Sequence, residues 1–497
     1  AFGLFTMGKR AVEDTTKHTD KSDAMFTHSK VPKHSSAPKR VPSATSIVSL
    51  NPGMGDDLES QLGKASQADA KAFLTEHEIT IHDPTAPLPC LSFEKAPFPK
   101  ALVGVLGAQP FQGPSAVQAA AWPLAAAGRD VLAIAKTGSG KTLGFLIPAL
   151  ARCIELKPKG DGSPIVLVMA PTRELAMQIK SEADKFGAPI GCRAVAVYGG
   201  APKWGQTRDL QAGCEVVIAT PGRMMDMLDL HGASWTGAST SLKDCRVLVL
   251  DEADRMLDMG FEKDIRAIVA QLPTDHQTLF FTATWPKAVQ RVAADILNAA
   301  TQVMVTVGSG GEKLTANKAV TQRVQVVEAR DKWPAFEKLL ESYKPGGVDA
   351  GKRVIVFSNT KRDVNWIAQH CWELLGNCVD TISGDRNQKE RESVIRRFRE
   401  GSVTIVIATD VAARGLDING IERVINYDFP GPDDYIHRIG RTGRAGSTGA
   451  ADTLFTSKER KHAKELVRIL TDAAQEVPEE LARMVGGAGG WGSKRSW

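Results

Sequence analysis

Short apolar runs alternate with amphipathic segments along most of the chain, beginning near Phe93. Unbroken β-branched runs that are separated by segments of helical period indicate strands of a parallel sheet covered on both faces. The first series of predicted strands is Val131 to Ala135, Ile165 to Ala170, Ala194 to Tyr198, Val216 to Thr220, Val247 to Leu250 and Leu279 to Thr282.

A glycine-rich polar segment, Gly308 to Lys318, interrupts the alternation and is typical of a linker. Beyond it the same pattern resumes. The second series of predicted strands is Arg323 to Val327, Val354 to Phe357, Ile405 to Ala408 and Val424 to Tyr427. The pattern therefore predicts an α/β protein with two tandem domains, each a parallel sheet flanked by helices.

Both ends of the chain lack this pattern. The first ninety residues are rich in Lys, His, Ser, Thr, Pro and Asp, with little period before Asp69 to His77, and we expect most of them to be disordered. A solvated tail, a basic arm with a nuclear address and a transit peptide are the alternatives; the acidic residues argue against the last. At the other end, Gly486 to Trp497 is either a plain flexible tail or a segment that stacks on bases and contacts phosphates through Trp491, Lys494, Arg495 and Trp497.

The predicted division has five parts. It consists of a tail over 1–90, a first domain over 91–307, a linker over 308–320, a second domain over 321–484 and a tail over 485–497.

Composition narrows the class of protein. A length of 497 residues favours more than one core, and 42% hydrophobic with 24% charged residues is ordinary for a globular protein. No apolar run approaches the roughly 20 residues that cross a bilayer, so we expect no membrane segment. The net charge of +5 permits contact with a polyanion, at a local site. Seven scattered cysteines without a C-x-x-C pair argue against a zinc site or a disulfide framework.

A phosphate-binding loop connects the first predicted strand to the helix-like segment Leu143 to Leu156. It reads AKTGSGKT and comprises Ala135, Lys136, Thr137, Gly138, Ser139, Gly140, Lys141 and Thr142. Backbone amides at a helix N-terminus bind phosphate oxygens, and the helix dipole adds to the attraction. We expect Lys141 to reach the β- and γ-phosphates of ATP and the Thr142 hydroxyl to bind Mg²⁺.

A carboxylate pair follows the predicted strand Val247 to Leu250. Asp251 is expected to hold the same Mg²⁺, and Glu252 to orient and deprotonate the attacking water. A phosphate loop followed by acidic residues at a strand end predicts an enzyme that hydrolyses ATP.

The order of short motifs resembles the DEAD-box RNA helicases of superfamily 2 over roughly Phe93 to Phe455. The first half shows AKTGSGKT, PTRELA, a Gly-Gly pair, TPGR, DEAD and TAT; the second shows VFSNT, GDRNQKER, ATDVAARGLD and HRIGRTGR. The resemblance implies two RecA-like domains and an RNA-dependent ATPase that unwinds RNA locally or remodels RNA-protein complexes. An RNA-binding clamp and a DNA helicase are the alternatives.

The segment FQGPSAVQ is similar to the adenine-reading segment of the family. A Gln118 amide offers a donor and an acceptor to adenine, and Phe111 would cover the base. A capping Gln and a core Phe are the structural alternative. The chain departs from the usual family pattern in this segment, at Ser383, and at Thr282, which with Thr284 is expected to couple hydrolysis to duplex opening.

The resemblance implies further roles in the second half. Arg441 and Arg444 would be arginine fingers for the γ-phosphate, His437 would link that phosphate to the TAT motif, and Asp417 would contact the ribose. RNA backbone contacts are implied for Thr172, Arg173, Gly200, Thr220, Pro221, Gly222 and Arg223 in the first half, and for Thr360, Gln388, Arg391, Thr409 and Arg414 in the second. Because such contacts read backbone and 2′-hydroxyl groups, binding should be largely independent of sequence and sensitive to salt.

Partners and compartment are expectations from the same resemblance. We expect a monomer that contacts ribonucleoproteins. Trp285-Pro286 resembles a nuclear subgroup associated with ribosome biogenesis, which favours the nucleus or nucleolus over the cytoplasm.

Overall fold

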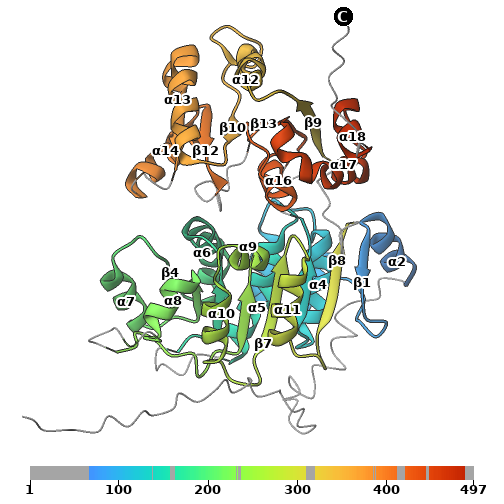
Figure 1. Cartoon of the computed structure of the whole chain (residues 1–497). Helices are drawn as coiled ribbons and strands as arrows, with labels where there is room; N and C mark the ends of the chain where they lie inside the picture. Colours follow the sequence, from blue (N-terminus) through green and yellow to red (C-terminus); the bar gives the residue numbers. More distant parts are fainter. Residues whose placement is uncertain are drawn as a thin grey trace, which may run out of the picture. The chain divides into compact units, whose positions relative to one another are not determined.

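The computed structural model describes residues 67–136, 138–156, 163–230, 232, 237–308, 319–383, 386, 388–410, 420–443 and 447–486. All of them belong to one unit, Pro42–Trp497. Within it the two predicted parallel-sheet domains are confirmed (Figure 1).

The sheet of the first domain has eight strands in the order β1-β8-β2-β7-β6-β3-β5-β4. Every pairing is parallel except that of β1 with β8. The strands are β1 (Ile79–Ile81), β2 (Val131–Ile134), β3 (Val166–Met169), β4 (Ala194–Val197), β5 (Val216–Ala219), β6 (Val247–Leu250), β7 (Gln277–Thr282) and β8 (Val303–Val307).

Helices cover both faces of this sheet, because its strands are apolar on both sides. Alternate residues of β2 divide between two cores: Val131 and Ala133 pack in one, Leu132 and Ile134 in the other. The helices are α2 (Gln67–Glu76), α3 (Lys100–Gly107), α4 (Ala116–Ala126), α5 (Lys141–Leu156), α6 (Arg173–Gly187), α7 (Lys203–Gln211), α8 (Pro221–Met227), α9 (Ala253–Asp258), α10 (Glu262–Val269) and α11 (Lys287–Ile296).

The sheet of the second domain has six parallel strands in the order β11-β12-β10-β13-β14-β9. They are β9 (Val320–Val326), β10 (Val354–Phe357), β11 (Val379–Ile382), β12 (Ile405–Ala408), β13 (Arg423–Asn426) and β14 (Gly449–Phe455). Two cores again lie on opposite faces. The helices are α12 (Lys332–Leu340), α13 (Lys361–Leu375), α14 (Gln388–Glu400), α16 (Pro432–Ile439), α17 (Ala463–Asp472) and α18 (Glu479–Gly486).

The prediction of a disordered tail up to residue 90 is wrong for its last part. Residues from 67 onward form α2 and β1, and β1 pairs antiparallel with β8, with Ile79 opposite Val307. Just beyond β1, Asp83 accepts a hydrogen bond of 2.7 Å from Arg129, whose Nε donates to Thr301 O. A three-residue strand has too short a pattern to be seen in the sequence, and it is stabilised by the edge that it covers.

The other boundaries shift by small amounts. β9 begins at Val320, at the end of the predicted linker, and α18 continues to Gly486. Ser309 to Lys318 and the C-terminal Trp491, Lys494, Arg495 and Trp497 lie outside the described residues, so what was predicted for them stays a prediction.

Candidate functional site

Three motifs of the first domain meet at the carboxyl ends of neighbouring strands. β7 lies between β2 and β6, and the register pairs Ile134 with Thr282 and Leu250 with Phe280. The phosphate loop follows β2, and Asp251 follows β6. Because parallel strands end at one edge of a sheet, the structure brings the loop, Thr282 and the carboxylates to that edge, where open α/β sheets bind ligands.

The phosphate loop is held by the last residue of β7 and by a hydrogen bond within the loop. Ala135 N donates to Thr282 O at 3.0 Å, and Lys141 Nζ donates to Ala135 O at 2.7 Å. Gly140 has a φ of +90°, and a Cβ there would lie 2.7 Å from Gln118 Nε2, so only glycine fits. Among the described residues, the buried Ser139 hydroxyl has no hydrogen-bond partner. A phosphate oxygen bound by the loop would supply one.

The remaining loop residues lie before and at the start of α5, and their contacts with ATP stay predictions. Thr142 is half-buried in the first turn of α5, Lys136 is exposed, and Thr137 lies outside the described residues. The donor set for Mg²⁺ consists of the Thr142 hydroxyl and the Asp251 carboxylate, oxygen ligands of the kind that this ion prefers. The described residues contain no cluster of three or more His, Cys, Asp or Glu side chains that could hold a metal by themselves. The protein groups therefore fit an ion that phosphate oxygens also ligate.

Gln118 makes the contacts of the structural alternative. Its Oε1 accepts from Ser115 N at 3.0 Å and its Nε2 donates to Gly140 O at 3.0 Å. Gln118 therefore caps α4 and braces the phosphate loop, and its contact with adenine stays a prediction. Phe111 is 46% exposed, with Lys185 Nζ 5.8 Å from the ring centroid, so it is not the core Phe of that alternative.

Asp251 and Glu252 are both buried at the end of β6, with exposed fractions of 3% and 8%. Burial and the neighbouring Glu252 charge raise the pKa of Asp251 to about 7, while Lys141 opposes the shift. Glu252 has φ +51° and ψ +50°, a left-handed conformation that is uncommon outside glycine. The turn directs two like charges into one buried space, which favours a bound cation.

Asp254 connects the DEAD segment to the TAT segment, a role that the sequence did not reveal. Its Oδ2 accepts from Thr284 N at 3.0 Å and from Thr284 Oγ1 at 2.6 Å. His437 Nε2 of the second domain lies 3.4 Å from the same oxygen. Burial alone would raise the pKa of Asp254, but the hydrogen bonds from His437 and Thr284 hold it well below its usual range. Thr282 Oγ1 donates to Thr284 O at 2.9 Å, which fixes the turn.

The residues predicted to bind RNA in the first domain follow β3, β4 and β5. Thr172 caps α6, accepting from Leu175 N at 3.2 Å, and Thr220 Oγ1 accepts from Gly199 N at 3.4 Å. Arg173 Nη1 donates to Gly200 O at 3.4 Å and the guanidinium lies over the Tyr198 ring.

Arg223 is turned inward. It donates to Gln206 Oε1 at 2.8 Å and to Ala201 O at 3.0 Å, so it braces the Gly-Gly loop against α8. Pro221 is buried and Gly222 half-buried at the start of α8. The RNA contacts of all these residues stay predictions.

The second domain repeats part of this arrangement. Thr360 caps α13 after β10, as Thr172 caps α6 after β3, and accepts from Asp363 N at 3.1 Å. Thr409 is buried at the end of β12, and Gln388 is the first residue of α14. Arg391 lies 3.0 Å from Glu174 of the first domain. Arg414 lies outside the described residues.

The helix α16 carries the predicted phosphate-binding side chains. His437 and Arg441 are both buried; His437 lies on the helix, and Arg441 lies two residues beyond its end at Ile439. The carboxylate of Asp434 accepts from Arg255 of α9. Arg444 and Asp417 lie outside the described residues, so their roles stay predictions.

Arg438 is the most buried arginine among the described residues, with 1% of its surface exposed, and was not found from the sequence. Its Nε and Nη2 donate to the two Asp410 oxygens, each at 2.6 Å. It also donates to Asn359 Oδ1 and to Asp428 O, both at 2.7 Å. Arg438 therefore ties the turns after β10, β12 and β13 to α16. The sequence could have indicated this role, because an arginine stays charged and needs partners when it lies on an apolar face of a helix.

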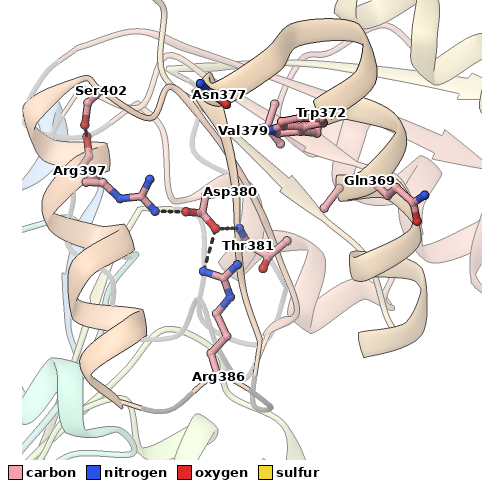
Figure 2. A pocket seen from close by; sticks show the side chains of 10 residues that line it. Gln369, Trp372, Asn377, Val379, Asp380, Thr381, Arg386, Arg397 and Ser402 are labelled. Atoms are coloured by element: carbon pink, nitrogen blue, oxygen red, sulfur yellow. Dashed lines mark hydrogen bonds and ion pairs between the residues drawn. The ribbon is translucent and has the colours of Figure 1, made fainter.

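A surface groove of about 620 Å³ lies beside the edge strand β11. Figure 2 shows Asp380 between the guanidinium groups of Arg386 and Arg397, with Trp372 and Gln369 of α13 on the other side. Arg386 lies 2.8 Å from Asp380. None of these residues belongs to the predicted site.

Two wider expectations can be compared with the structure. None of the helices in the described ranges is long and apolar enough to cross a bilayer. The seven cysteines are free; Cys378 is half-buried and the other six are buried, as expected for small apolar side chains.

These features define a two-domain phosphate-loop protein in which Asp254 of the DEAD segment and the adjacent Arg255 contact His437 and Asp434 of helix α16. Residues 115–292 match the family model described as DEAD/DEAH box helicase, and residues 331–446 match the helicase conserved C-terminal domain. The chain is 45% identical over 433 residues to DEAD-box ATP-dependent RNA helicase 14 of Arabidopsis thaliana, covering 87% of this chain and 67% of that protein. It is 45% identical to the ATP-dependent RNA helicase dbp2 of Neosartorya fischeri, covering 86% of this chain and 76% of the relative.

The chain belongs to the DEAD-box ATP-dependent RNA helicase family. It spans 52% of a related helicase of Oryza sativa subsp. japonica, to which it is 47% identical. Among solved structures, it is similar to Mss116p bound to ssRNA and AMP-PNP, with 27% identity, a TM-score of 0.65 and coverage of 78% of this chain and 79% of that one. It is also similar to S. cerevisiae Dbp5 bound to RNA and ADP BeF3, with 27% identity, a TM-score of 0.64 and coverage of 80% and 99%.

Proposed function

We propose that this chain is an ATP-dependent RNA helicase in which RNA-stimulated ATP hydrolysis drives local opening of short duplexes or remodelling of RNA-protein complexes. The observation that carries the proposal is the meeting of the phosphate loop, Thr282 and the DEAD segment at the carboxyl ends of β2, β7 and β6. Family membership and the RNA-bound and nucleotide-bound relatives support it.

The groups of the first domain divide the work on ATP. Backbone amides of the loop and Lys141 bind the phosphates, and Gln118 holds the loop in place through Gly140. Held by Thr142 and Asp251, Mg²⁺ would neutralise charge that develops on the phosphate oxygens. Glu252 takes the proton of the attacking water, and its turn beside β6 fixes the direction of its carboxylate.

The second domain supplies positive charge. Arg441, together with Arg444, stabilises the charge on the γ-phosphate in the transition state, a contribution of about 10³ to 10⁵ in rate for an arginine finger. His437 of α16 lies next to Asp254 and so connects α16 to Thr284. Hydrolysis then alters contacts at the TAT turn, and RNA held by residues after β3, β5, β10 and β12 is released.

Two measurements test the proposal. Wild-type protein should hydrolyse ATP faster with single-stranded RNA and should displace a strand from a short RNA duplex. Glu252→Gln should abolish turnover while an ATP and RNA complex still forms. Glu155→Gln, which changes a surface partner of Arg152, is the matched control and should behave as wild type.

Each alternative predicts a different result. A protein that only clamps RNA would show RNA-stimulated ATPase without strand displacement, and a DNA helicase would be stimulated equally by single-stranded DNA. Unchanged turnover in Glu252→Gln would contradict the assignment of the base.

We further propose that the chain acts as a monomer on nuclear ribonucleoproteins, a proposal that rests on the resemblance at Trp285-Pro286. In the structure the Trp285 ring packs edge-on against Phe280, at 6.4 Å between centroids, so this residue also serves the core. Crosslinking the protein to RNA in cells and sequencing the recovered RNA tests it. Absence of pre-ribosomal RNA among the products would count against a role in ribosome biogenesis.

A further inference from the structure

Trp204 is the most exposed aromatic side chain among the described residues, with 69% of its surface in solvent. It lies in the first turn of α7, four residues after Gly200. Arg208, one helical turn later, lies over its ring, with the guanidinium carbon 5.4 Å from the ring centroid. An aromatic ring that is mostly in water adds little to the core, and Trp and Arg are residue types enriched at the energetic centres of binding interfaces.

The first turn of α7 is attached to the two loops that are expected to hold the RNA backbone. Gln206 bonds Tyr198 N and Tyr198 O, each at 3.2 Å, and accepts from Arg223 at 2.8 Å. Lys203 Nζ donates to Asp226 O of α8 at 3.0 Å. The position of Trp204 is therefore fixed relative to the Gly-Gly loop and to the TPGR segment at the start of α8.

The charge on this turn favours an anion. The Arg208 side chain is 72% exposed, and the acidic residue within ion-pair distance of it in the described part of the chain, Asp209, lies 4.0 Å away, at the outer limit of such a pair. The guanidinium therefore keeps hydrogen-bond donors for a phosphate, and the ring keeps a free face for a base.

We propose that Trp204 and Arg208 form an accessory RNA-binding site, in which one base of the bound strand stacks on Trp204 and the adjoining phosphate meets Arg208. This proposal rests on the proposed function, because it extends the expected RNA path beyond Gly200 and Arg223. The occupant is single-stranded RNA, since the site is continuous with that path. Stacking tolerates any base, so the site adds affinity without reading sequence.

The test compares RNA lengths in the ATPase assay, using oligouridylates of about 6 and about 12 nucleotides. Trp204→Ala should raise the concentration of the longer RNA that gives half-maximal stimulation by about tenfold, the value of one stacked base. The shorter RNA reaches only the residues that contact the RNA backbone. Its half-maximal concentration should therefore change by less than about twofold. Trp204→Phe should keep most of the affinity for the longer RNA, and the rate at saturating RNA should not change.

Trp372→Ala is the matched control, because Trp372 is an exposed tryptophan on α13 of the second domain. It should leave both half-maximal concentrations unchanged. Equal affinity of wild type and Trp204→Ala for the longer RNA would overturn the proposal, as would equal weakening for both lengths, which would mean that Trp204 only supports the Gly-Gly loop. Failure of every RNA to stimulate the wild-type ATPase would instead contradict the proposed function.

Discussion

The two domains bury charge at the same edge of similar sheets in opposite ways. In the first, Asp251, Glu252 and Asp254 place like charges together, and burial beside Glu252 raises the pKa of Asp251 to about 7. In the second, Arg438 is balanced within its own domain by Asp410 and by two further oxygen acceptors. The edge in the first domain can therefore bind a cation and phosphates, whereas the buried charge of Arg438 at the edge in the second domain is already neutralised by residues of that domain.

The comparison shows that a buried charged side chain indicates a functional site only when no oppositely charged group of the same domain pairs with it. Arg438 is more buried than Glu252, but its hydrogen bonds serve to hold three turns in register. Asp251, whose pKa is raised, reduces the stability of the folded domain at neutral pH, whereas Asp254 is stabilised by Thr284 and His437. Measurements of unfolding can separate these two cases.

The largest expected effect is that of Arg438→Leu. Removal of this guanidinium leaves the half-buried Asp410 without its partner and takes the donor from Asn359 Oδ1 and Asp428 O, which should lower the free energy of unfolding of the second domain by more than about 2 kcal/mol. Guanidinium chloride unfolding would measure it. The control is Arg386→Leu, because Arg386 pairs with Asp380 but is a third exposed, and it should cost less than about 1 kcal/mol. Similar losses in both variants would break the comparison.

The opposite sign is expected for Asp251→Asn in protein without nucleotide or Mg²⁺. Asparagine keeps the acceptor for Glu252 N and removes one of two adjacent buried charges. Because the pKa of Asp251 is raised to about 7, the free energy of unfolding should rise by more than about 1 kcal/mol above pH 7, and this gain should fade as the pH falls toward 4, while ATPase activity is lost at every pH. Thermal unfolding and an ATPase assay measure the two effects. Asp258→Asn is the control, because the Asp258 carboxylate is half-exposed. It should change the free energy of unfolding and the ATPase activity only slightly. A less stable Asp251→Asn would show that the acidic cluster is not under repulsion.

A smaller effect is expected for Thr284→Val, which removes one donor from Asp254. The buried carboxylate keeps the bond from Thr284 N but loses that from the hydroxyl, at a cost of about 1.5 kcal/mol. The ATPase should also respond less to RNA, because the turn after β7 is no longer bound to Asp254 by its side chain. Thr282→Ser is the control: it keeps the hydroxyl that donates to Thr284 O, so RNA stimulation should remain. Equal RNA stimulation in wild type and Thr284→Val would contradict the coupling.

The smallest effect is expected for Asp83→Asn, at the exposed anchor of β1. Hydrogen bonds from Thr85 and then Arg129 lower the pKa of Asp83 from 3.8 to about 2. The stabilisation of the folded state by ionised Asp83 is therefore present above about pH 4 and is lost as the pH falls toward 2. Hydrogen exchange of the β1 amides should be faster in the variant at neutral pH, and this difference should shrink in acid. If the difference in exchange rate between wild type and Asp83→Asn did not change with pH, the packing of the side chain and not its charge would hold β1 in place.

The sequence predicted much of this fold because its central strands are strongly apolar. All ten predicted strands exist, with ends that shift by a few residues. Four strands were missed: β1, β8, β11 and β14. β8 (Val303–Val307) is apolar like its neighbours, so its pattern was present in the sequence and was overlooked. The other three have physical causes. β1 is three residues long, while β11 and β14 include Asp380, Asp452 and Thr453, polar residues that side-chain partners stabilise. Such partners come from distant segments, so the local pattern cannot indicate them.

The candidate site was predictable to the extent that single motifs carry the chemistry. The phosphate loop, Asp251 and Glu252 lie where their spacing predicts. Contacts between motifs were not visible: Asp254 with Thr284, Gln118 with Gly140, and Arg438 with Asp410 each join segments that only the strand order brings together. Sequence therefore identified the reacting groups better than the groups that position them.

The backbone of Glu252 has a consequence for how this protein can change over generations. A left-handed conformation at a residue other than glycine costs about 1 to 2 kcal/mol, so glycine or asparagine at this place would make the folded chain more robust. Selection for persistence alone would therefore remove this glutamate. Its retention in a lineage is a record of continued selection for catalysis, and its loss from a descendant would be an early sign that the protein had come to serve as a passive binder.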